Sequence, residues 1–163
     1  GFPLGLPALD VNAVGAGGGS IAWIDVDGLL KVGPQSSGAH PGPVCYGLGG
    51  VDATLTDANV LLGRLNDRSL LDGRMQIHRD LAEAAIGRLA EELGLDVMET
   101  AQGIIRVACA TVVKAIRPLS VERGYDPADF CLFSFGSAAC SGQPKCGTEG
   151  RTTNCQFRSA RTI

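Results

Sequence analysis

The strongest constraint on the fold of this chain is a run of small residues, from Gly15 to Ser20, that lies between two apolar segments. The flanking apolar residues are Leu9, Val11 and Val14 before the run and Ile21, Trp23, Ile24 and Val26 after it. Apolar segments on both sides of a glycine cluster, with alternation on the second side, predict a strand, a tight loop and a second strand. Such a loop exposes consecutive backbone N–H groups, which can bind an anion.

The run matches neither of two familiar phosphate-binding motifs. The dinucleotide fingerprint requires glycine at its first, third and sixth positions and then a helix, whereas the sixth position here is Ser20 and a strand is predicted to follow. A Walker A loop requires a Lys-Ser/Thr pair after its last glycine. Here Ser20 directly follows Gly19, and the nearest lysine is Lys31.

Two interpretations of the glycine run remain. In the first, it is a hairpin-type phosphate loop, whose backbone amides form a nest for phosphate oxygens while nearby carboxylates hold a divalent metal ion. The nucleotide-binding candidates are then Gly15, Gly17, Gly18, Gly19 and Ser20, and the metal-ligating candidates are Asp10, Asp25 and Asp27. In the second, the run is a glycine-rich bulged hairpin without a ligand, because glycine is favoured wherever φ must be positive.

Composition predicts one globular domain. The chain has 163 residues, of which 45% are hydrophobic, and a mean hydropathy of +0.15. No apolar run approaches the ~20 residues that cross a bilayer, and the N-terminus lacks the pattern of a secretory signal. The net charge of −3 argues against a nucleic-acid surface, which needs a basic face. We therefore expect a cytoplasmic protein with no membrane and no nucleic-acid partner.

A change in composition divides the chain near residue 136. Residues 1–136 contain 10 basic and 16 acidic side chains, a net charge of −6, whereas residues 137–163 contain 4 and 1, a net charge of +3. The second stretch has too few large apolar residues to form a core. Its three cysteines match no zinc-binding spacing, and it contains no histidine. We expect an ordered domain over 1–136 and a disordered tail over 137–163.

Residues 31–47 are predicted to form an ordered loop that lines a site. Three prolines and four glycines set its turns, unlike the few repeated residue types of a flexible linker. The loop contains His40, a candidate catalytic residue that could act as a base, a metal ligand or a hydrogen-bond partner of the substrate. The alternative is a histidine that only faces solvent. Cys45, in the same loop, is expected to be a reduced, partly buried thiol.

The sequence Thr56-Asp57-Ala58-Asn59 precedes an apolar stretch and predicts the start of a helix. Thr56 is the expected N-cap, with Asp57 in the first turn, where its charge suits the helix dipole. The alternative function of Asp57 is contact with a metal ion or with the substrate, which makes it a second candidate catalytic residue.

Two longer helices follow. Helical spacing predicts the first from Arg79 to Leu93, ended by Gly94, and the second starts at a capping box of Asp96 and Glu99 and stops before Pro118. The positions expected to be buried are Leu81, Ala85, Leu89 and Leu93 in the first helix and Ile104, Val107, Val112 and Ile116 in the second. A short apolar run over residues 130–135 predicts a buried strand, which leads into a second loop of small residues.

Three long motifs occur in the chain in a fixed order. They cover residues 10–22, with the glycine run, residues 32–47, which include Ser37-Gly38-Ala39-His40-Pro41-Gly42-Pro43-Val44-Cys45-Tyr46-Gly47, and residues 56–65, which include Thr56-Asp57-Ala58-Asn59. Together they resemble the hydantoinase A and 5-oxoprolinase family. The resemblance continues to residues 121–124 and Phe130, and so covers about residues 1–136. Members of that family are much longer, which implies that this chain is a fragment without the N-terminal lobe.

The resemblance implies an α/β (α+β) fold, namely part of an actin-like ATPase lobe with N-terminal β-hairpins, a proline/glycine-rich loop and two to three helices. It implies ATP and Mg²⁺ as cofactors, with the glycine run as the second phosphate loop of that superfamily. A cyclic amide is the implied substrate, and a hydantoinase B-type subunit or domain is the implied partner. If that amide is 5-oxoproline, the pathway is glutathione metabolism.

The resemblance also implies the chemistry. The family couples ATP hydrolysis to the opening of a cyclic amide, as in 5-oxoproline to glutamate or the opening of hydantoin. An amide carbonyl is a poor electrophile, and transfer of the γ-phosphoryl group to its oxygen makes attack by water feasible. Relatives instead phosphorylate ketones or bicarbonate for ATP-dependent carboxylation, so a subunit of an acetone or acetophenone carboxylase is a second expectation. A truncated product without activity is the third.

The chain departs from the family pattern near residue 136. The family sequence is Phe-Gly-Gly-Ala-Gly-Pro-Leu-His, whereas this chain has Phe135-Gly136-Ser137-Ala138-Ala139-Cys140. The abrupt change predicts a frameshifted, mis-spliced or mis-predicted C-terminus. Because the first lobe and this loop are both missing, the isolated chain is expected to hydrolyse no ATP.

Overall fold

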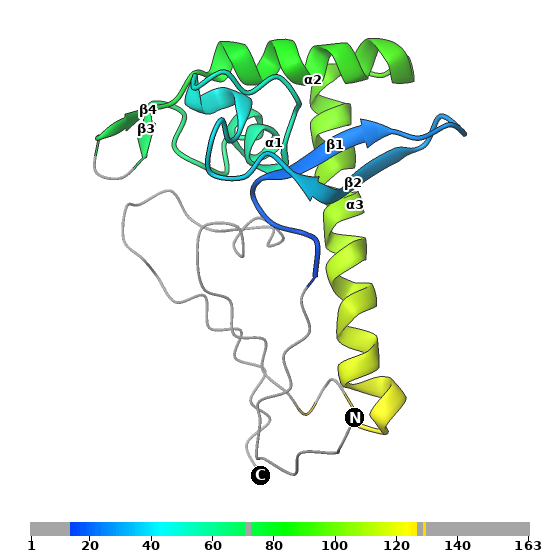
Figure 1. Ribbon diagram of the computed structural model, residues 1–163. Coiled ribbons are helices and arrows are strands. Elements are labelled where there is room, and N and C mark those ends of the chain that lie inside the picture. Colours follow the sequence, from blue (N-terminus) through cyan, green and yellow to red (C-terminus); the bar gives the residue numbers. More distant parts are fainter. Residues whose placement is uncertain (1–13, 71–72, 127–128, 130–163) are drawn as a thin grey trace, which may run out of the picture.

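Two β-hairpins and three α-helices make up the described part of the chain, residues 14–70, 73–126 and 129 of the computed structural model (Figure 1). The elements in chain order are β1 Ser20–Ile24, β2 Leu30–Ser36, η1 Val44–Tyr46, α1 Leu55–Leu61, β3 Ser69–Leu70, β4 Met75–Gln76, α2 Arg79–Leu93, α3 Val97–Ile116, η2 Arg117–Leu119 and η3 Val121–Arg123. This mixture of helices and strands agrees with the predicted class. The predicted strands before residue 14 and over 130–135, and the predicted tail, lie outside the described residues.

The strands β1 and β2 pair antiparallel, with Ala22 opposite Val32 and Ile24 opposite Leu30. The register is irregular between Ser20 and Ala22. The prediction of a loop over residues 31–47 was therefore wrong for its first residues, which continue β2 to Ser36 despite Pro34. A proline is tolerated there because β2 lies at the edge of the hairpin, next to the irregular part of the register, where a missing N–H costs least.

Helix α1 is capped by Thr54, and not by Thr56 as the sequence predicted. Thr54 has an extended backbone (φ −120°, ψ 171°) and forms a β-bridge with Ile21. It makes a reciprocal capping box with Asp57, in which each side chain bonds the other residue's backbone N–H. Thr56 is already inside the helix, so its hydroxyl is available for a partner outside α1.

Helix α2 has the predicted bounds, and Gly94 ends it in the left-handed conformation (φ 66°). Its buried face differs from the predicted one and consists of Ala82, Ala85, Ile86 and Ala90. Leu81, which was expected to be buried, has 39% of its surface exposed. The alanines have small side chains, and α2 packs through this face against α1, α3 and η1.

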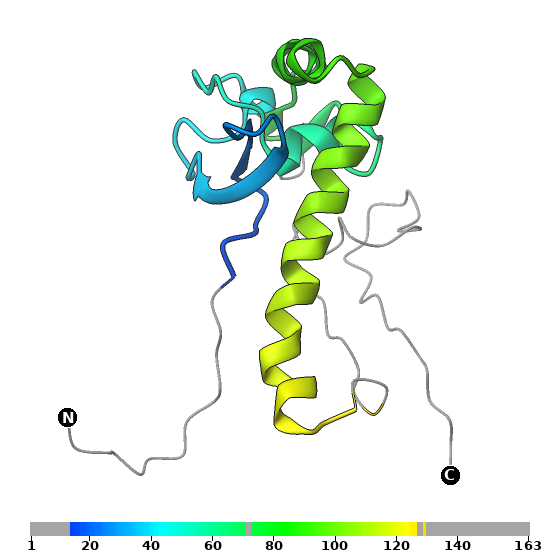
Figure 2. The ribbon, with the colours of Figure 1, turned by 90° about the vertical axis from the view of Figure 1, so that its right-hand side faces the viewer.

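Helix α3 begins after Asp96, whose carboxylate accepts a hydrogen bond from the Met98 N–H (2.8 Å). Only its first half is packed: Ile104 and Ile105 are buried, whereas Val112 is 39% and Val113 60% exposed. The prediction that Val112 is buried was therefore wrong, because α1, α2 and β2 pack against the first half of the helix. Figure 2 shows this half extending beyond the other described elements.

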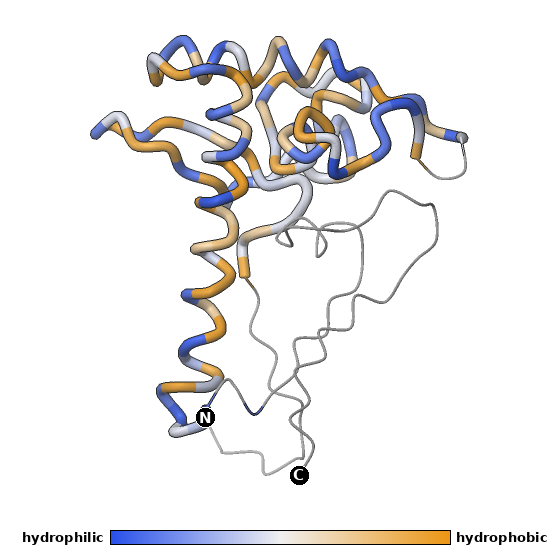
Figure 3. Tube along the Cα trace, turned by 180° about the vertical axis from the view of Figure 1, so that it is seen from behind, coloured by the Kyte–Doolittle hydropathy of each residue, from blue (hydrophilic) through white to orange (hydrophobic). Residues whose placement is uncertain are grey.

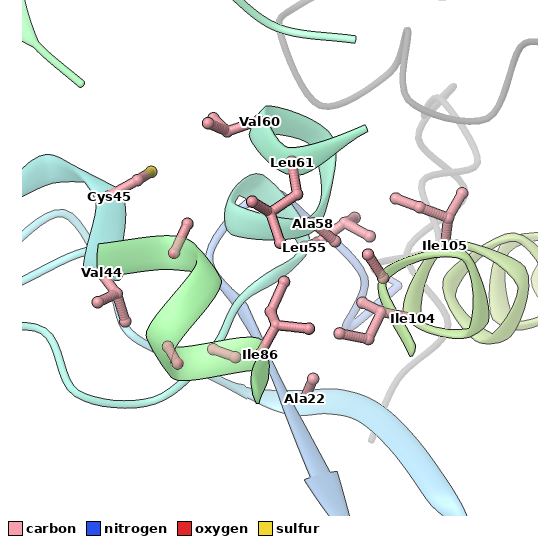
Figure 4. Close-up of a cluster of buried hydrophobic side chains, with 14 of the residues drawn as sticks. Ala22, Val44, Cys45, Leu55, Ala58, Val60, Leu61, Ile86, Ile104 and Ile105 are labelled. Carbon is pink, nitrogen blue, oxygen red and sulfur yellow. The ribbon is translucent and has the colours of Figure 1, made fainter. Parts of the chain in front are cut away.

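The core lies where η1, α1, α2, β1 and the first half of α3 meet (Figure 4). Its fully buried members include Ala58 and Val60 of α1, Ile86 of α2 and Ile104 of α3. Apolar residues continue along α3 past this packed region (Figure 3). Within the described residues, no helix combines the length and the apolar character that a membrane span requires.

Candidate functional site

The glycine run forms a loop that lies between the end of β2 and the start of α1. Residues 53 and 54 run beside β1, with an Ala22 N–H to Ala53 carbonyl hydrogen bond (2.8 Å) and the bridge between Ile21 and Thr54. The predicted strand after the loop is confirmed as β1. This arrangement brings residues around position 56 to the loop, although 38 positions separate Gly18 from Thr56 in sequence.

Three consecutive carbonyl groups of the loop are held by hydrogen bonds. The Gly17 carbonyl accepts from the Ser20 N–H (3.0 Å). The Gly18 carbonyl accepts from the N–H and from the hydroxyl of Thr56, both at 2.9 Å. The Gly19 carbonyl accepts from the N–H (2.9 Å) and the hydroxyl (3.3 Å) of Ser37. These contacts fix the loop to β1, to α1 and to the residue that follows β2.

The N–H groups of the loop, unlike these carbonyls, are only partly hydrogen-bonded within the described structure. The Gly17 N–H donates to the Ser20 hydroxyl (2.8 Å), and Ser20 itself is buried. The N–H groups of Gly18 and Gly19 have no hydrogen-bond partner among residues 14–70, 73–126 and 129. Two adjacent backbone donors without a partner among the described residues, next to carbonyls of Gly17, Gly18 and Gly19 that are engaged, can bind an anion.

Packing explains some of the glycines but not all. A Cβ on Gly15 would lie 3.1 Å from the Pro34 Cβ, and a Cβ on Gly19 would lie 2.8 Å from the Ser36 hydroxyl. A Cβ on Gly17 would meet nothing within 4 Å, and Gly17 has no positive φ. A side chain at position 15 or 19 would therefore displace Pro34 or the Ser36 hydroxyl, whereas the space beside Gly17 is open.

Asp57 is a fully buried carboxylate with four hydrogen-bond donors. It accepts from the N–H groups of Val44 (3.3 Å), Cys45 (2.8 Å) and Thr54 (2.8 Å) and from the Thr54 hydroxyl (2.7 Å). These bonds hold η1 against the start of α1. In this structure Asp57 organises the backbone next to the glycine loop, and its direct contact with substrate or metal stays a prediction.

Two side chains beside Asp57 are held in their neutral forms. Burial raises the pKa of the Cys45 thiol, and the negative charge of Asp57 raises it further. Burial likewise raises the pKa of Tyr46, with smaller contributions from Cys45 and Asp57. Cys45 is a free thiol, as expected, and so is Cys109. The raised pKa makes Cys45 a poor nucleophile.

His40 is exposed on the turn from Ser37 to Gly42, which a Gly42 N–H to Ser37 carbonyl bond closes (3.2 Å). The structure therefore places it three residues from the side chain that holds Gly19, but it does not bring His40 to Asp57 by any contact. The second histidine, His78, begins α2: its N–H donates to the Cys45 carbonyl (2.8 Å), and a Cβ on Gly47 would lie 2.7 Å from its ring.

The candidate metal ligands are not gathered at the glycine loop. Asp25 lies in the turn at the far end of β1, where its carboxylate accepts from the Leu29 N–H (2.8 Å) and pairs with Lys31 (3.3 Å). The hydrogen bond from Leu29 is the main cause of its lowered pKa. Asp27 is exposed in the same turn, and Asp10 lies outside the described residues. The described part of the chain contains no group of three potential metal-ligating side chains.

Sequence reasoning missed several residues that shape this site. Thr54 and Asp57 have the three-residue separation of a capping box, a signal that was present in the sequence. No local pattern marks Ser37 and Thr56 as partners of the glycine loop. Asn59 was also missed: it is 3% exposed, and its side-chain oxygen has no hydrogen-bond partner within the described structure.

The chain matches the family model described as hydantoinase/oxoprolinase over residues 1–156. It is 51% identical to the caprolactamase subunit alpha of Pseudomonas jessenii over 139 residues, 85% of this chain and 20% of that subunit. It is 46% identical to the acetophenone carboxylase gamma subunit of Aromatoleum aromaticum, over 77% of this chain and 18% of that subunit. It is 36% identical to the 5-oxoprolinase of Dictyostelium discoideum, over 90% of this chain and 12% of that enzyme.

Two solved structures of similar proteins also match this chain. The ATP-dependent caprolactamase of Pseudomonas jessenii superposes with a TM-score of 0.71 at 52% identity, over 78% of this chain and 18% of that one. A nucleotide-free acetone carboxylase superposes with a TM-score of 0.69 at 33% identity, over 74% and 17%. The chain thus spans about a fifth or less of the relatives that it matches. On these matches, the chain belongs to the hydantoinase/oxoprolinase family.

Proposed function

We propose that this chain is part of an ATP-dependent enzyme that opens a cyclic amide, and that its glycine loop binds phosphate. The observation that carries the proposal is the pair of N–H groups at Gly18 and Gly19, which have no partner in the described part of the chain, beside the Gly17, Gly18 and Gly19 carbonyls that Ser20, Thr56 and Ser37 hold. The open space beside Gly17 leaves room for a ligand at the same loop. We further propose that the described elements are part of an actin-like ATPase lobe.

ATP, when bound, supplies a phosphoryl group that activates an amide carbonyl toward water. The loop from Gly15 to Ser20 is proposed to contribute backbone donors that orient the phosphate oxygens and offset their charge. His40, exposed on the adjacent turn, is proposed to contact the substrate or to move a proton. Asp57 is proposed to act by holding η1 in place. Mg²⁺ is proposed as the accompanying ion; of the candidate ligands, Asp25 pairs with Lys31 at the far end of β1 from the loop, so Asp10 is the candidate kept in this chain.

The names of the relatives support a cyclic amide as substrate, since one relative is a caprolactamase and another a 5-oxoprolinase. A place in glutathione metabolism depends on 5-oxoproline being that substrate. Three relatives are named as subunits. We therefore propose a second subunit or domain, of hydantoinase B type, as the partner.

A carboxylase is the second candidate function, because an acetophenone carboxylase subunit and an acetone carboxylase subunit are 46% and 35% identical to this chain. Phosphate release by the enzyme that contains this chain separates the two functions. Stimulation by 5-oxoproline, hydantoin or caprolactam supports the amide hydrolase, whereas stimulation that requires a ketone together with bicarbonate supports the carboxylase.

The phosphate loop is tested by calorimetric titration of the chain with MgATP. Gly17→Ala places a methyl group in the open space beside the loop, so we expect unchanged thermal unfolding and at least about a fivefold loss of affinity. Gly87→Ala is the matched control, because its Cβ also meets nothing within 4 Å but lies on α2, away from the loop. Equal MgATP affinity of the Gly17→Ala variant and the unmodified chain would contradict the proposal.

The boundary at residue 136 also stays a prediction, although the family match extends to residue 156. Sequencing of the gene around codon 136 tests it. A second reading frame that encodes a family-like Phe-Gly-Gly-Ala-Gly-Pro segment is the expected result, and the absence of any such frame would contradict a frameshift.

A further inference from the structure

We infer that Thr56 is a positioning residue, which aims the Gly19 N–H at the anion by holding the Gly18 carbonyl. This inference rests on the proposed phosphate loop. Thr56 donates two hydrogen bonds to that carbonyl oxygen, from its N–H and from its hydroxyl, both 2.9 Å long. The oxygen has two lone pairs, so both of its acceptor sites are filled.

The geometry of the peptide bond links the orientation of the Gly18 carbonyl to the direction of the Gly19 N–H. The Gly18 carbonyl and the Gly19 N–H belong to the same planar peptide unit, and in a trans peptide they point in opposite directions. The cis peptide bonds of the described chain precede Pro34 and Pro41, so this unit is trans. Because Thr56 holds the carbonyl toward α1, the Gly19 N–H points away from α1, where it has no partner among the described residues.

The opposite orientation would prevent anion binding. Rotation of this peptide unit by about half a turn would present the carbonyl oxygen, a negative dipole end, to the phosphate and hide the N–H. The neighbouring unit is held as well, since Ser37 donates two bonds to the Gly19 carbonyl. The Thr56 hydroxyl adds a second bond where the backbone already supplies one, and so biases the unit toward the binding orientation.

Thr56 is itself held rigidly. It is 6% exposed and follows the Thr54 cap by two residues, within the turn that Asp57 fixes. Ala58 and Val60, the next members of α1, are fully buried in the core. The position of its hydroxyl is therefore set by the core and by the capping box, not by the ligand.

The inference is tested on the 163-residue chain with MgATP as the probe. Thr56→Val removes the hydroxyl while it keeps the shape and the backbone bond, and Thr56→Ser restores a hydroxyl. We expect Thr56→Val to weaken MgATP binding about fivefold to tenfold, the usual effect of one hydrogen bond, and Thr56→Ser to remain within about twofold of the unmodified chain. Thr111→Val is the matched control, because the Thr111 hydroxyl also donates to a carbonyl, that of Val107, but on α3 (3.1 Å).

A second measurement does not depend on the folding of the valine variant. In the ¹⁵N-labelled unmodified chain, saturation with MgATP should shift the Gly19 amide proton downfield by more than the Gly17 amide proton, which already donates to Ser20. A folded Thr56→Val variant with unchanged affinity would overturn the inference and leave the phosphate loop standing. Bound MgATP without a shift of the Gly19 amide proton would overturn the inference and also the part of Gly19 in the phosphate loop. Absence of MgATP binding by the unmodified chain would instead overturn the phosphate loop and this inference together.

Discussion

At the scale of single residues, the buried side chain of Asp57 joins two elements of the fold. Its carboxylate bonds two residues of η1 and the cap residue of α1, and it is completely buried. A buried charge is tolerated only when enough hydrogen bonds replace its water, and four donors do so here. The residue was predicted to lie in the first turn of a helix, which is confirmed. Its contacts with residues 44 and 45 depend on tertiary packing.

Asp57→Asn should therefore destabilise the chain by about 2 kcal/mol. The amide NH₂ of asparagine is a donor, so at least one N–H or O–H that now donates to the carboxylate would lose its acceptor. Equilibrium unfolding in urea measures the loss. Asp52→Asn is the control, since Asp52 is exposed, and it should change stability by less than about 0.5 kcal/mol. Equal effects of the two substitutions would show that the four bonds contribute nothing specific.

Gly33 should be the least replaceable of the glycines beside the loop. It has a positive φ of 70°, and a Cβ there would lie against the Gly15 carbonyl. Gly63 has a similar φ of 67° with nothing within 4 Å, so Gly63→Ala measures the backbone strain alone, about 1 kcal/mol. In urea unfolding, Gly33→Ala should cost at least about 1 kcal/mol more than Gly63→Ala. Equal losses would mean that the glycine loop moves aside without cost.

The Cys45 thiol should make the chain less stable at alkaline pH. Its pKa is raised in the folded state, so the folded protein keeps a proton that the unfolded chain releases above pH ~8.5. The contribution of the Cys45 thiol to the free energy of unfolding is fully present below that pH. It falls as the pH rises, by at most about 1.4 kcal/mol per pH unit. Tyr46 adds to the loss only above pH ~10. Urea unfolding at pH 7.5, 8.5 and 9.5 measures the slope, and a Cys45→Ala variant with the same slope would contradict the assignment.

At the scale of elements, local chemistry in the sequence predicted the helices well. The bounds of α2 and α3 follow from Gly94, Asp96 and Pro118, which act through the backbone next to them. The faces that these helices bury were predicted less well. Periodicity identifies a stripe of apolar residues, but α2 uses its alanines because they allow a close approach, and Leu81 is left exposed.

The two halves of α3 should differ in stability. Ile104 is fully buried, so Ile104→Ala should cost about 3 kcal/mol, whereas Val113→Ala, at a position 60% exposed, should cost less than about 0.5 kcal/mol. Amide hydrogen exchange provides the second measurement. Residues 101–108 should exchange mainly through global unfolding, and residues 112–116 faster. Uniform protection along α3 would show that another part of the molecule covers its second half.

At the scale of the whole molecule, the chain matches a fifth or less of the length of the relatives compared above. Its described residues include the proposed phosphate loop but no cluster of metal-ligating side chains. Phosphoryl transfer depends on both, because the metal ion neutralises the developing charge.

The isolated chain should therefore show no magnesium-dependent ATP hydrolysis above background in a phosphate-release assay, even if it binds MgATP. Gly18→Val serves as the control variant, since a side chain at the centre of the loop would block the site. A magnesium-dependent rate in the unmodified chain that disappears in Gly18→Val would contradict this prediction.

The sequence by itself determined the family, the bounds of α2 and α3, the strand after the glycine run and the helix that contains Asp57. These features depend on residues close together in the chain, through hydrogen bonds, backbone conformation and side-chain spacing. Only the tertiary structure decided that Thr56 and Ser37 hold the glycine loop, that Asp57 bonds η1 and that the second half of α3 projects from the core. Those contacts join segments 12 to 38 positions apart, or depend on which elements pack together, and no local pattern encodes that packing.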